Sequence, residues 1–493
     1  MTTMDHSGLE LRHRVHRDRR LATVHLGWAL LVAAAMAVAL WVGWIGYEAS
    51  DDSLYHAGAI RWLTAPPFEG SDHWSTRFPL TLTFAAVMGV IGQNYVAFGL
   101  TAILFYVLLV AVTGRFTAQV AGQRAGWIAA LLTATLPVVV SHASTVSVDL
   151  TEAAALLGGA LLVGTARDDA RGLVRAGLGG VLFGIAVLCR ETSVLALAVL
   201  GPLLLIGRPF SRRVLIACGL GAAAVLVGEA AYQYVMTADP LRRYTIAFHH
   251  DEHIDRAANR EGNFLLWSPI DPLLVLLVND DFGLLFWLFG AAIAGGAWRM
   301  VAAERRLPLV LLGAMAGSSF LLVSVLYSKL VLNPRYFMLA ALAAVIVLAV
   351  WLDRLGWRAR WAILAVTIGS SLLLMSVGNA HPRWSMEALV SAAAAHPGEV
   401  VAGDADDAKR ATLPMALIGQ RNIAIAPARP GGLVVAHADA APRGEIVTRY
   451  PSPPTRLGGI LRPLGLEPLV PAPIARRMFA PSPEMVLVRT PAG

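Results

Sequence analysis

The sequence holds only two cysteines, Cys189 and Cys218, among its 493 residues. Both lie inside apolar runs, which excludes a disulfide framework and a cysteine-based zinc site. Charged residues are also scarce, at 15%, whereas 56% of the residues are hydrophobic. An ordinary soluble globular protein carries more charge. The composition therefore predicts a polytopic membrane protein.

Lysine is nearly absent, with Lys329 and Lys409 the only two, so the formal net charge of +7 comes from arginine. The arginines stand in short segments between apolar runs, as the positive-inside rule describes for cytoplasmic loops. A nucleic-acid partner is therefore not needed to explain the charge. Several arginines also precede the first apolar run, and we predict that residues 1–20 form a basic cytoplasmic N-terminus ahead of a retained anchor.

Long apolar runs alternate with Arg-rich or acidic turns, which predicts an α-helical transmembrane domain over residues 21–378. We expect about eleven transmembrane helices, because Arg-rich segments flank the run 173–207 on both sides and require two short spans that meet at Arg190. The expected crossings are 21–45, 95–113, 126–140, 150–165, the two within 173–207, 214–236, 282–297, 307–326, 337–352 and 361–377.

Two longer loops, 46–94 and 237–281, are expected on the periplasmic side. The first contains a predicted helix at 53–63 and an apolar stretch at 79–91, which is too short for a span and is predicted to be interfacial or re-entrant. Residues 379–493 change to an Ala/Gly/Pro/Asp-rich composition and predict a small periplasmic α/β domain. Its expected strands are 399–402, 423–426, 432–435 and 485–488.

An acidic pair, Asp51 and Asp52, follows directly on the first predicted span, with Tyr55 and His56 one turn later. Carboxylates at a membrane surface can be partly desolvated, and this makes such a residue a candidate general base. The alternative is that the pair only caps the helix at 53–63, a position that Asp favours. The pattern leaves both interpretations open.

The remaining candidates from the residues alone are one acid and three cations. Asp149 is a helix N-cap or a functional carboxylate. Arg190 lies between two short spans, where a cation is costly unless the adjacent Glu191 pairs with it or it binds the phosphate of a lipid. Lys329 and Arg335 lie near the same predicted membrane surface.

One loop segment offers candidate metal ligands. These are His249, His250, Asp251, Glu252 and His253. The segment lacks the spacing of a closed zinc site, so a solvated polar loop is the favoured interpretation, and a divalent metal stays open.

The order of these features resembles the GT-C glycosyltransferases, above all the protein O-mannosyltransferase-like family 39 and the bacterial lipid A aminoarabinose transferases. Asp51-Asp52-Ser-Leu-Tyr55 is similar to the Asp-Glu-x-x-Tyr of their first external loop, with Asp52 in place of the usual Glu. Arg77-Phe-Pro79-Leu80 resembles the His-Pro-Pro-Leu that opens their second loop helix.

Three further matches extend this resemblance over about residues 20–380. Ser147-Val-Asp149 stands where the family has its second acidic residue, Arg190 where it has a basic residue for the lipid phosphate, and Arg335-Tyr336 matches a late Arg-Tyr pair. The resemblance does not cover the C-terminal domain.

The resemblance implies an inverting transferase that moves a sugar from a polyprenyl-phosphate donor to an acceptor hydroxyl at the periplasmic face of a bacterial inner membrane. The acceptor class would be a lipid A or other glycolipid, a polysaccharide or a protein. Asp51 would be the general base, and Asp149 or Asp52 would orient the acceptor or help to hold a metal, which some relatives use.

The other implied roles concern the donor phosphate and the loops. The implied donor-phosphate ligands are Arg190, Lys329, Arg335 and Tyr336, and the implied acceptor or loop contacts are Tyr55, His56 and Arg77. No nucleotide-sugar site is expected, since no Gly-rich phosphate loop is present.

Two rival functions remain open: a transporter or flippase for lipid-linked glycans, and a non-catalytic membrane subunit. Ion-coupled transport needs ionisable residues deep in the spans, and the predicted spans are almost free of them, with Glu229 the clearest exception, which argues against that function. The enzyme differs from the non-catalytic subunit in one expectation, that Asp51, Asp149, Arg190 and Arg335 face a single cavity.

Overall fold

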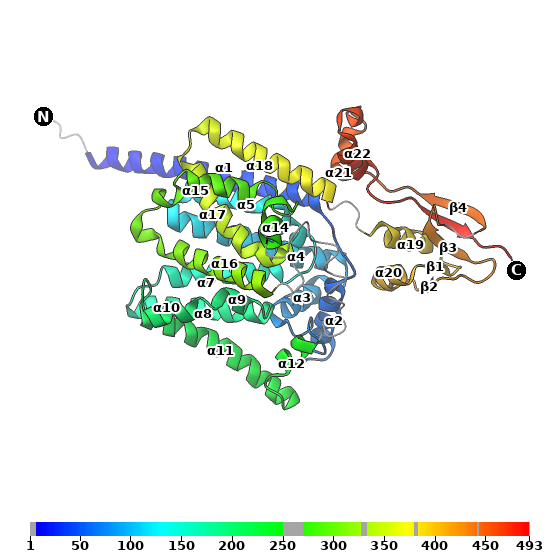
Figure 1. Ribbon diagram of the computed structural model, residues 1–493, viewed down its shortest axis with the longest axis horizontal. Coiled ribbons are helices and arrows are strands. Elements are labelled where there is room, and N and C mark those ends of the chain that lie inside the picture. Colours follow the sequence, from blue (N-terminus) through cyan, green and yellow to red (C-terminus); the bar gives the residue numbers. More distant parts are fainter. Residues whose placement is uncertain (1–5, 250–269, 327–332, 379–382, 441–442, 493) are drawn as a thin grey trace.

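The computed structural model describes residues 6–249, 270–326, 333–378, 383–440 and 443–492, which form a helical bundle and a smaller part with a sheet (Figure 1). The bundle extends to residue 378, and the chain then continues into the sheet-containing part. In Figure 1 the first helix projects on the left and the sheet lies on the right, so the two ends of the chain are at opposite ends of the molecule.

The first half of the bundle alternates long helices with short ones. In chain order these are α1 (His6–Gly43), α2 (Asp51–Thr64), α3 (Phe78–Ile91), α4 (Tyr95–Ala121), α5 (Gln123–Ala134), α6 (Pro137–Ala143), α7 (Asp149–Gly164), α8 (Ala170–Cys189), α9 (Ser193–Leu197) and α10 (Leu200–Ile206). The predicted loop helix at 53–63 and the predicted apolar helix at 79–91 correspond to α2 and α3.

The second half completes the bundle with α11 (Arg212–Thr237), α12 (Arg242–His249), α14 (Asp271–Val278), α15 (Leu285–Ala294), η1 (Ala297–Met300), η2 (Ala303–Arg305), α16 (Leu307–Leu326), η3 (Pro334–Phe337), α17 (Met338–Arg354) and α18 (Trp357–Gly378). Local sequence explains several of the helix starts. Asn94 caps α4 through Ala97 N, Asp169 caps α8 through Gly172 N, and Ser211 caps α11. Short polar side chains at these positions satisfy backbone N–H groups that the helix itself leaves free.

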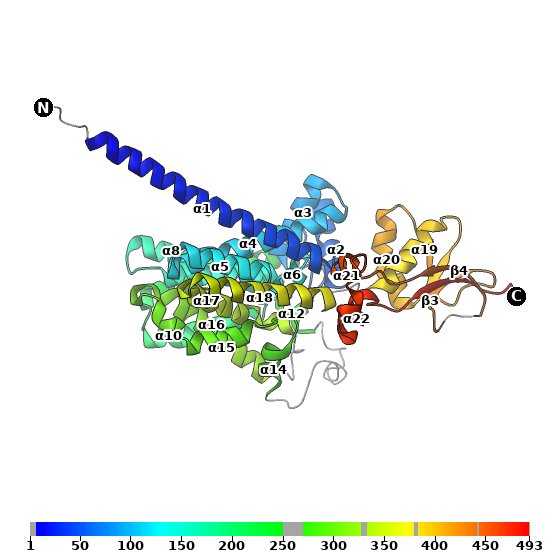
Figure 2. The ribbon, with the colours of Figure 1, turned by 90° about the horizontal axis from the view of Figure 1, so that it is seen from above.

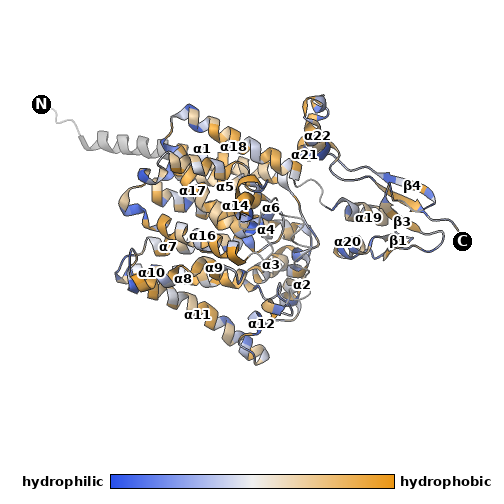
Figure 3. Cartoon of the chain, viewed as in Figure 1, coloured by the Kyte–Doolittle hydropathy of each residue, from blue (hydrophilic) through white to orange (hydrophobic). Residues whose placement is uncertain are grey.

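Within the described residues, seven helices are long and apolar enough to cross a membrane, and the bent pair α5–α6 raises this number to eight. Apolar residues run along these helices, whereas hydrophilic residues gather at helix ends and loops (Figure 3). The chain is thus a multi-pass α-helical membrane protein. The predicted number of eleven crossings is not confirmed, because 126–140, 150–165, the second half of 173–207 and 282–297 correspond to short or bent helices.

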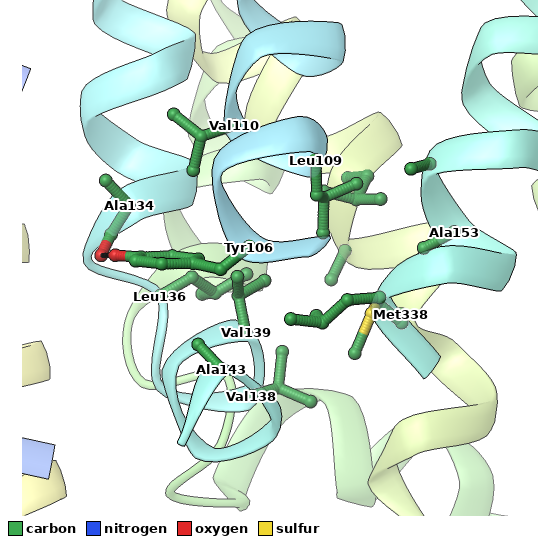
Figure 4. Close-up of a cluster of buried hydrophobic side chains, with 14 of the residues drawn as sticks. Tyr106, Leu109, Val110, Ala134, Leu136, Val138, Val139, Ala143, Ala153 and Met338 are labelled. Carbon is green, nitrogen blue, oxygen red and sulfur yellow. Dashed lines mark hydrogen bonds between the residues drawn. The ribbon is translucent and has the colours of Figure 1, made fainter. Parts of the chain in front are cut away.

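The break between α5 and α6, where the axes bend by 64°, is stabilised by side chains and by a distant carbonyl. Pro137 cannot continue α5 because it lacks an N–H group. The Tyr106 hydroxyl donates to the Ala134 carbonyl, and Val138 N donates to the Asp281 carbonyl at 3.0 Å. Leu109, Val139 and other apolar side chains enclose the break (Figure 4). Unpaired backbone groups are costly inside a membrane, so this packing fixes the chain that leads to Asp149.

The first and last helices of the bundle lie side by side (Figures 1 and 2). Trp28 of α1 stacks on Trp361 of α18, with ring centres 5.7 Å apart and planes at 12°. Both helices run toward the sheet-containing part, so α18 delivers the C-terminal residues to the end of the bundle where α2 lies.

The C-terminal part packs helices against a five-stranded mixed sheet with the order β2-β1-β3-β5-β4. Its elements are α19 (Trp384–Ala395), β1 (Val401–Gly403), α20 (Ala405–Leu417), β2 (Ile423–Ile425), β3 (Leu433–His437), β4 (Glu445–Tyr450), α21 (Arg456–Leu461), η4 (Glu467–Leu469), α22 (Ala472–Phe479) and β5 (Met485–Arg489). The four predicted strands are confirmed. β4 was not predicted, because its residues are mostly exposed and no apolar run marks it.

Polar contacts between described residues join this part to the bundle. Arg383 lies 3.6 Å from the carboxylate of Glu48, in the turn between α1 and α2. Ser376 of α18 and Thr455 share a hydroxyl hydrogen bond of 2.8 Å. The C-terminal part therefore lies beside the loop that carries the acidic pair.

Candidate active site

Four segments bring their polar residues to the end of the bundle beside the C-terminal part. α7 begins at Asp149, α8 ends at Cys189 so that Arg190 is its C-cap, α2 begins at Asp51, and η3 leads into α17. Because α7 starts and α8 ends at the same side, the two helices are antiparallel neighbours. Residues about 40 positions apart in sequence are thereby placed together.

Asp149 and Arg190 form a buried ion pair. Asp149 Oδ1 lies 2.7 Å from Arg190 Nη1, with exposed side-chain fractions of only 2% and 6%. On the other side of the carboxylate, His142 Nδ1 lies 3.5 Å from Asp149 Oδ2. A buried charge needs such compensation, since leaving it unpaired costs several kcal/mol.

A second carboxylate in this cluster escaped the sequence-based prediction. Glu152 lies 3.5 Å from the same Arg190 nitrogen and accepts a 2.5 Å hydrogen bond from the Ser193 hydroxyl. Residues three apart on a helix share a face, so the spacing of Glu152 from Asp149 was a usable signal. Arg190 is thus neutralised by two acids and not by the neighbouring Glu191 that the sequence suggested.

Glu191 has a different partner, Arg243 of α12, whose side chain is fully buried. Arg243 Nη2 lies 2.7 Å from Glu191 Oε1 and donates to the Leu188 carbonyl at 2.8 Å, while Nη1 donates to the Thr76 carbonyl at 2.6 Å. These bonds tie the C-terminal end of α8 to the 46–94 loop. Arg243 therefore helps to fix the position of Arg190 from a segment that sequence patterns did not single out.

Asp51 and Arg335 form a more open pair on the same side. Their charged atoms lie 3.6 Å apart, and their side chains are 37% and 31% exposed. Tyr336 lies between the two ion pairs, because the guanidinium groups of both Arg190 and Arg335 face its ring, at 5.3 and 5.8 Å from the ring centre. Cation–π contacts of this kind orient the arginines.

Asp149, Arg190, Arg335 and Tyr336 line one small cavity of about 30 Å³. Its polar lining includes Asp149, Glu152, Arg190, Ser193 and Arg335, and its apolar lining comes from α7, α9, α16 and α17. Asp51, which was expected to face the same cavity, is not one of its lining residues but is paired with Arg335, which is. Charged groups and apolar side chains thus meet at this cavity.

Asp52, predicted as a second catalytic carboxylate, accepts hydrogen bonds from backbone N–H groups. It is 3% exposed and accepts hydrogen bonds from the N–H groups of Glu48, Ser50 and Ser53, at 2.6, 2.8 and 3.0 Å. Burial raises the pKa of the Asp52 carboxyl, and these three bonds partly offset the increase. Its oxygens hold the turn before α2, which leaves Asp51 as the exposed acid of the pair.

The predicted acceptor or loop contacts Tyr55 and Arg77 are buried and bonded to each other. Arg77 donates to the Tyr55 hydroxyl and also contacts the His73 ring nitrogen. Burial raises the pKa of the Tyr55 hydroxyl to about 12, with the nearby Arg77 charge acting in the opposite direction. The two side chains thus hold the part of the 46–94 loop around Arg77 against α2.

His56 points away from the cluster, toward α3 and α4. Its ring stacks on Phe98 with ring centres 5.1 Å apart, and burial lowers its pKa to about 4. Glu48, on the other side of Asp52, has its pKa raised by burial in spite of Arg383 nearby.

Lys329, and His250, Asp251, Glu252 and His253 of the predicted metal segment, lie outside the described residues, whereas His249 ends α12. In the described ranges no group of three or more His, Cys, Asp or Glu side chains could hold a metal ion. Asp149 and Asp51 instead each have an arginine nearby, at 2.7 and 3.6 Å.

The fold can be compared with solved membrane enzymes. ArnT from Cupriavidus metallidurans in the apo state matches with a TM-score of 0.58 and 15% sequence identity, covering 86% of this chain and 96% of that chain. ArnT bound to undecaprenyl phosphate matches with a TM-score of 0.52 and 18% identity, covering 80% and 71%. The Archaeoglobus fulgidus oligosaccharyltransferase AglB, in complex with an inhibitory peptide and a dolichol-phosphate, matches with a TM-score of 0.50 and 13% identity, covering 81% and 64%.

These likenesses define the class of fold. The chain has the GT-C fold that ArnT, the lipid A aminoarabinose transferase, shares with the AglB oligosaccharyltransferase, as the sequence resemblance implied. No protein-family model matches the sequence, and no curated protein matches it by sequence similarity. At identities below 20% the shared feature is the fold.

Proposed function

We propose that this protein is an inverting glycosyltransferase that moves a sugar from a polyprenyl-phosphate donor to an acceptor hydroxyl. One observation carries the proposal: Arg335 and Tyr336, adjacent in sequence, contact both Asp51 and the Asp149–Arg190 cluster around one cavity. The neighbours give independent support for the donor class, since the ArnT structure holds undecaprenyl phosphate and the AglB structure a dolichol-phosphate.

The proposed reaction uses a carboxylate as the general base and cations to stabilise the leaving phosphate. Asp51 takes the proton of the acceptor hydroxyl while the hydroxyl oxygen attacks the anomeric carbon from the face opposite the phosphate. The bond between the anomeric carbon and the phosphate oxygen breaks, and its electron pair leaves with the lipid phosphate. Arg335 stabilises that developing charge because it is partly exposed and lines the cavity.

Arg190 contributes differently in this proposal, since Asp149 and Glu152 already compensate its charge. It sets the position of Tyr336 and the shape of the cavity wall, and Lys329 would add a further cation for the phosphate. Arg335, whose pair with Asp51 is more open, is therefore the cation that the proposal assigns to the ligand phosphate.

The membrane orientation is part of the same proposal. Exposed arginines gather at the loops farthest from the cluster, as in 299–306 and 354–360, which the positive-inside rule assigns to the cytoplasm. Loops 46–94 and 237–281 and residues 379–493 would then be periplasmic, in a bacterial inner membrane.

A transfer assay with a panel of polyprenyl-phosphate sugars tests the proposal. Membranes with wild-type protein should transfer sugar from at least one donor to endogenous acceptor, and Arg335→Gln should lose most of this transfer. Arg61→Gln, on the exposed side of α2, is the matched control and should retain it. Wild-type activity that survives in Arg335→Gln would overturn the site assignment, and transfer from none of the donors would overturn the donor class.

A further inference from the structure

A second hollow lies at the opposite end of the bundle from the candidate active site. It has a volume of about 310 Å³ and lies between the end of α4, the η1–η2 turn and the end of α17. Its polar lining consists of four arginines, Arg299, Arg305, Arg306 and Arg354, and its remaining lining residues are apolar.

The distance from the active site follows from α17. Arg335 and Tyr336 precede the first residue of this helix, and Arg354 is its last residue. A helix of 17 residues spans about 25 Å, which approaches the thickness of the hydrocarbon core. The arginine hollow therefore lies at the other surface of the membrane, separate from the cavity described above.

Among the residues that the structure describes, no carboxylate is paired with these arginines. None lines the hollow, and across the described ranges none of the four arginines takes part in an ion pair. Glu304 belongs to the same turn, but its side chain is exposed and does not line the hollow. Asp353, which precedes Arg354 in the sequence, is paired with Arg124.

Backbone contacts fix the shape of the hollow without using up its donors. Arg306 Nε donates to the Val301 carbonyl at 2.9 Å, and Arg354 Nη2 contacts the Met300 carbonyl at 3.4 Å. Each guanidinium has five N–H groups, so most of them remain for a ligand. Planar guanidinium groups bind phosphate oxygens well.

An aromatic side chain marks the membrane level at this site. The Arg306 guanidinium lies 5.3 Å from the ring centre of Trp298, whose side chain is 44% exposed. Tryptophan is enriched where the hydrocarbon core meets the headgroups. Next to it, α15 exposes apolar residues such as Ile293 to the surroundings. A ligand in the hollow thus meets cations at its head and an apolar helix beside it.

We propose that this hollow binds the phosphate headgroup of an anionic phospholipid at the membrane face opposite the active site. Basic pockets between transmembrane helices at the cytoplasmic surface are known to hold such headgroups. The combination of four unpaired arginines, a carboxylate-free lining and a flanking tryptophan favours a lipid phosphate over a soluble anion, because the soluble anion would make no use of the apolar side.

Native mass spectrometry of the full-length protein in detergent tests this site. Wild type is titrated with phosphatidylglycerol and, separately, with phosphatidylcholine, and the triple variant Arg299→Gln/Arg305→Gln/Arg354→Gln is compared with it. Arg306 is left unchanged because it supports the turn. The control triple Arg171→Gln/Arg175→Gln/Arg213→Gln removes the same charge from the starts of α8 and α11, outside the hollow.

Wild type and the control should bind phosphatidylglycerol in preference to phosphatidylcholine, and the hollow variant should bind it more weakly, by about tenfold or more. Excess inorganic phosphate should displace little of the lipid. Equal binding by the two triple variants would overturn the proposal. Full displacement by inorganic phosphate, or no preference for the anionic lipid in the wild type, would overturn the assignment to a lipid headgroup.

Discussion

Arg190 and Asp149 form an ion pair of 2.7 Å in which neither side chain is more than 6% exposed. Glu152 approaches the same guanidinium at 3.5 Å. This cluster joins α7 to the end of α8 and forms one wall of the candidate active-site cavity. Because the pair is buried, it should contribute to the stability of the fold as well as to the charge of the cavity wall.

Removal of Arg190 alone should therefore be more damaging than removal of Arg190 together with Asp149, and Asp149→Asn alone completes the comparison. Arg190→Met leaves two buried carboxylates without a cation and should lower the free energy of unfolding by about 3–5 kcal/mol. The double variant Arg190→Met/Asp149→Asn should recover part of this loss, because one of the stranded charges is gone. Unfolding of the purified proteins in detergent measures the coupling. Additive effects of the two substitutions would show that the pair does not interact.

His56 should make stability depend on pH. Burial lowers its pKa from 6.5 to about 4, so below pH 6.5 the unfolded chain takes up a proton that the folded chain does not. The free energy of unfolding should fall as the pH is lowered from 6.5 to 4, by at most about 3 kcal/mol from this residue.

The variant His56→Phe keeps an aromatic ring against Phe98 and cannot titrate. It should be less sensitive to pH between 6.5 and 4 than the wild type, in unfolding measurements at several pH values. His437→Phe, at an exposed strand position, is the control and should follow the wild type. Parallel curves for wild type and His56→Phe would contradict the assignment.

Arg243 should act as a positioning residue. It is fully buried and bonds to Thr76, Leu188 and Glu191. Arg243→Met should lower the free energy of unfolding by about 2–4 kcal/mol, since buried partners lose their donor. Because the end of α8 then shifts, kcat should fall more than KM rises in the folded fraction. An unchanged kcat at reduced stability would limit Arg243 to a purely structural role.

Sequence patterns predicted the features that depend on local periodicity. Apolar runs predicted the long helices, whereas Asp149, considered as an N-cap, is the first residue of α7 and makes no capping hydrogen bond. The loop helix predicted at 53–63 is α2, and the order of short motifs anticipated the GT-C fold. The number of crossings was less predictable, because helices such as α7 and α15 are shorter than the membrane is thick and depend on neighbours.

The detailed contacts of the site depend on three-dimensional placement. Glu191, its neighbour in sequence, was one of two candidate partners for Arg190, but α8 ends at Cys189, and the two side chains find partners on different elements. The sequence pattern could not distinguish the roles of Asp51 and Asp52, since only the fold shows which carboxylate accepts hydrogen bonds from backbone N–H groups. Arg243 belongs to a loop segment that no periodicity marks.

The measurement that most directly tests the account compares sugar transfer by Asp51→Asn and Asp52→Asn. Asp51 is the exposed acid beside Arg335, whereas Asp52 is held by three backbone N–H groups. Asp51→Asn should fold normally and lose about 10²- to 10⁴-fold in turnover. Asp52→Asn should lose about 1–2 kcal/mol of stability and keep most of its turnover per folded molecule. Wild-type turnover in Asp51→Asn, or an equal loss in a folded Asp52→Asn, would contradict the assignment of Asp51 as the general base.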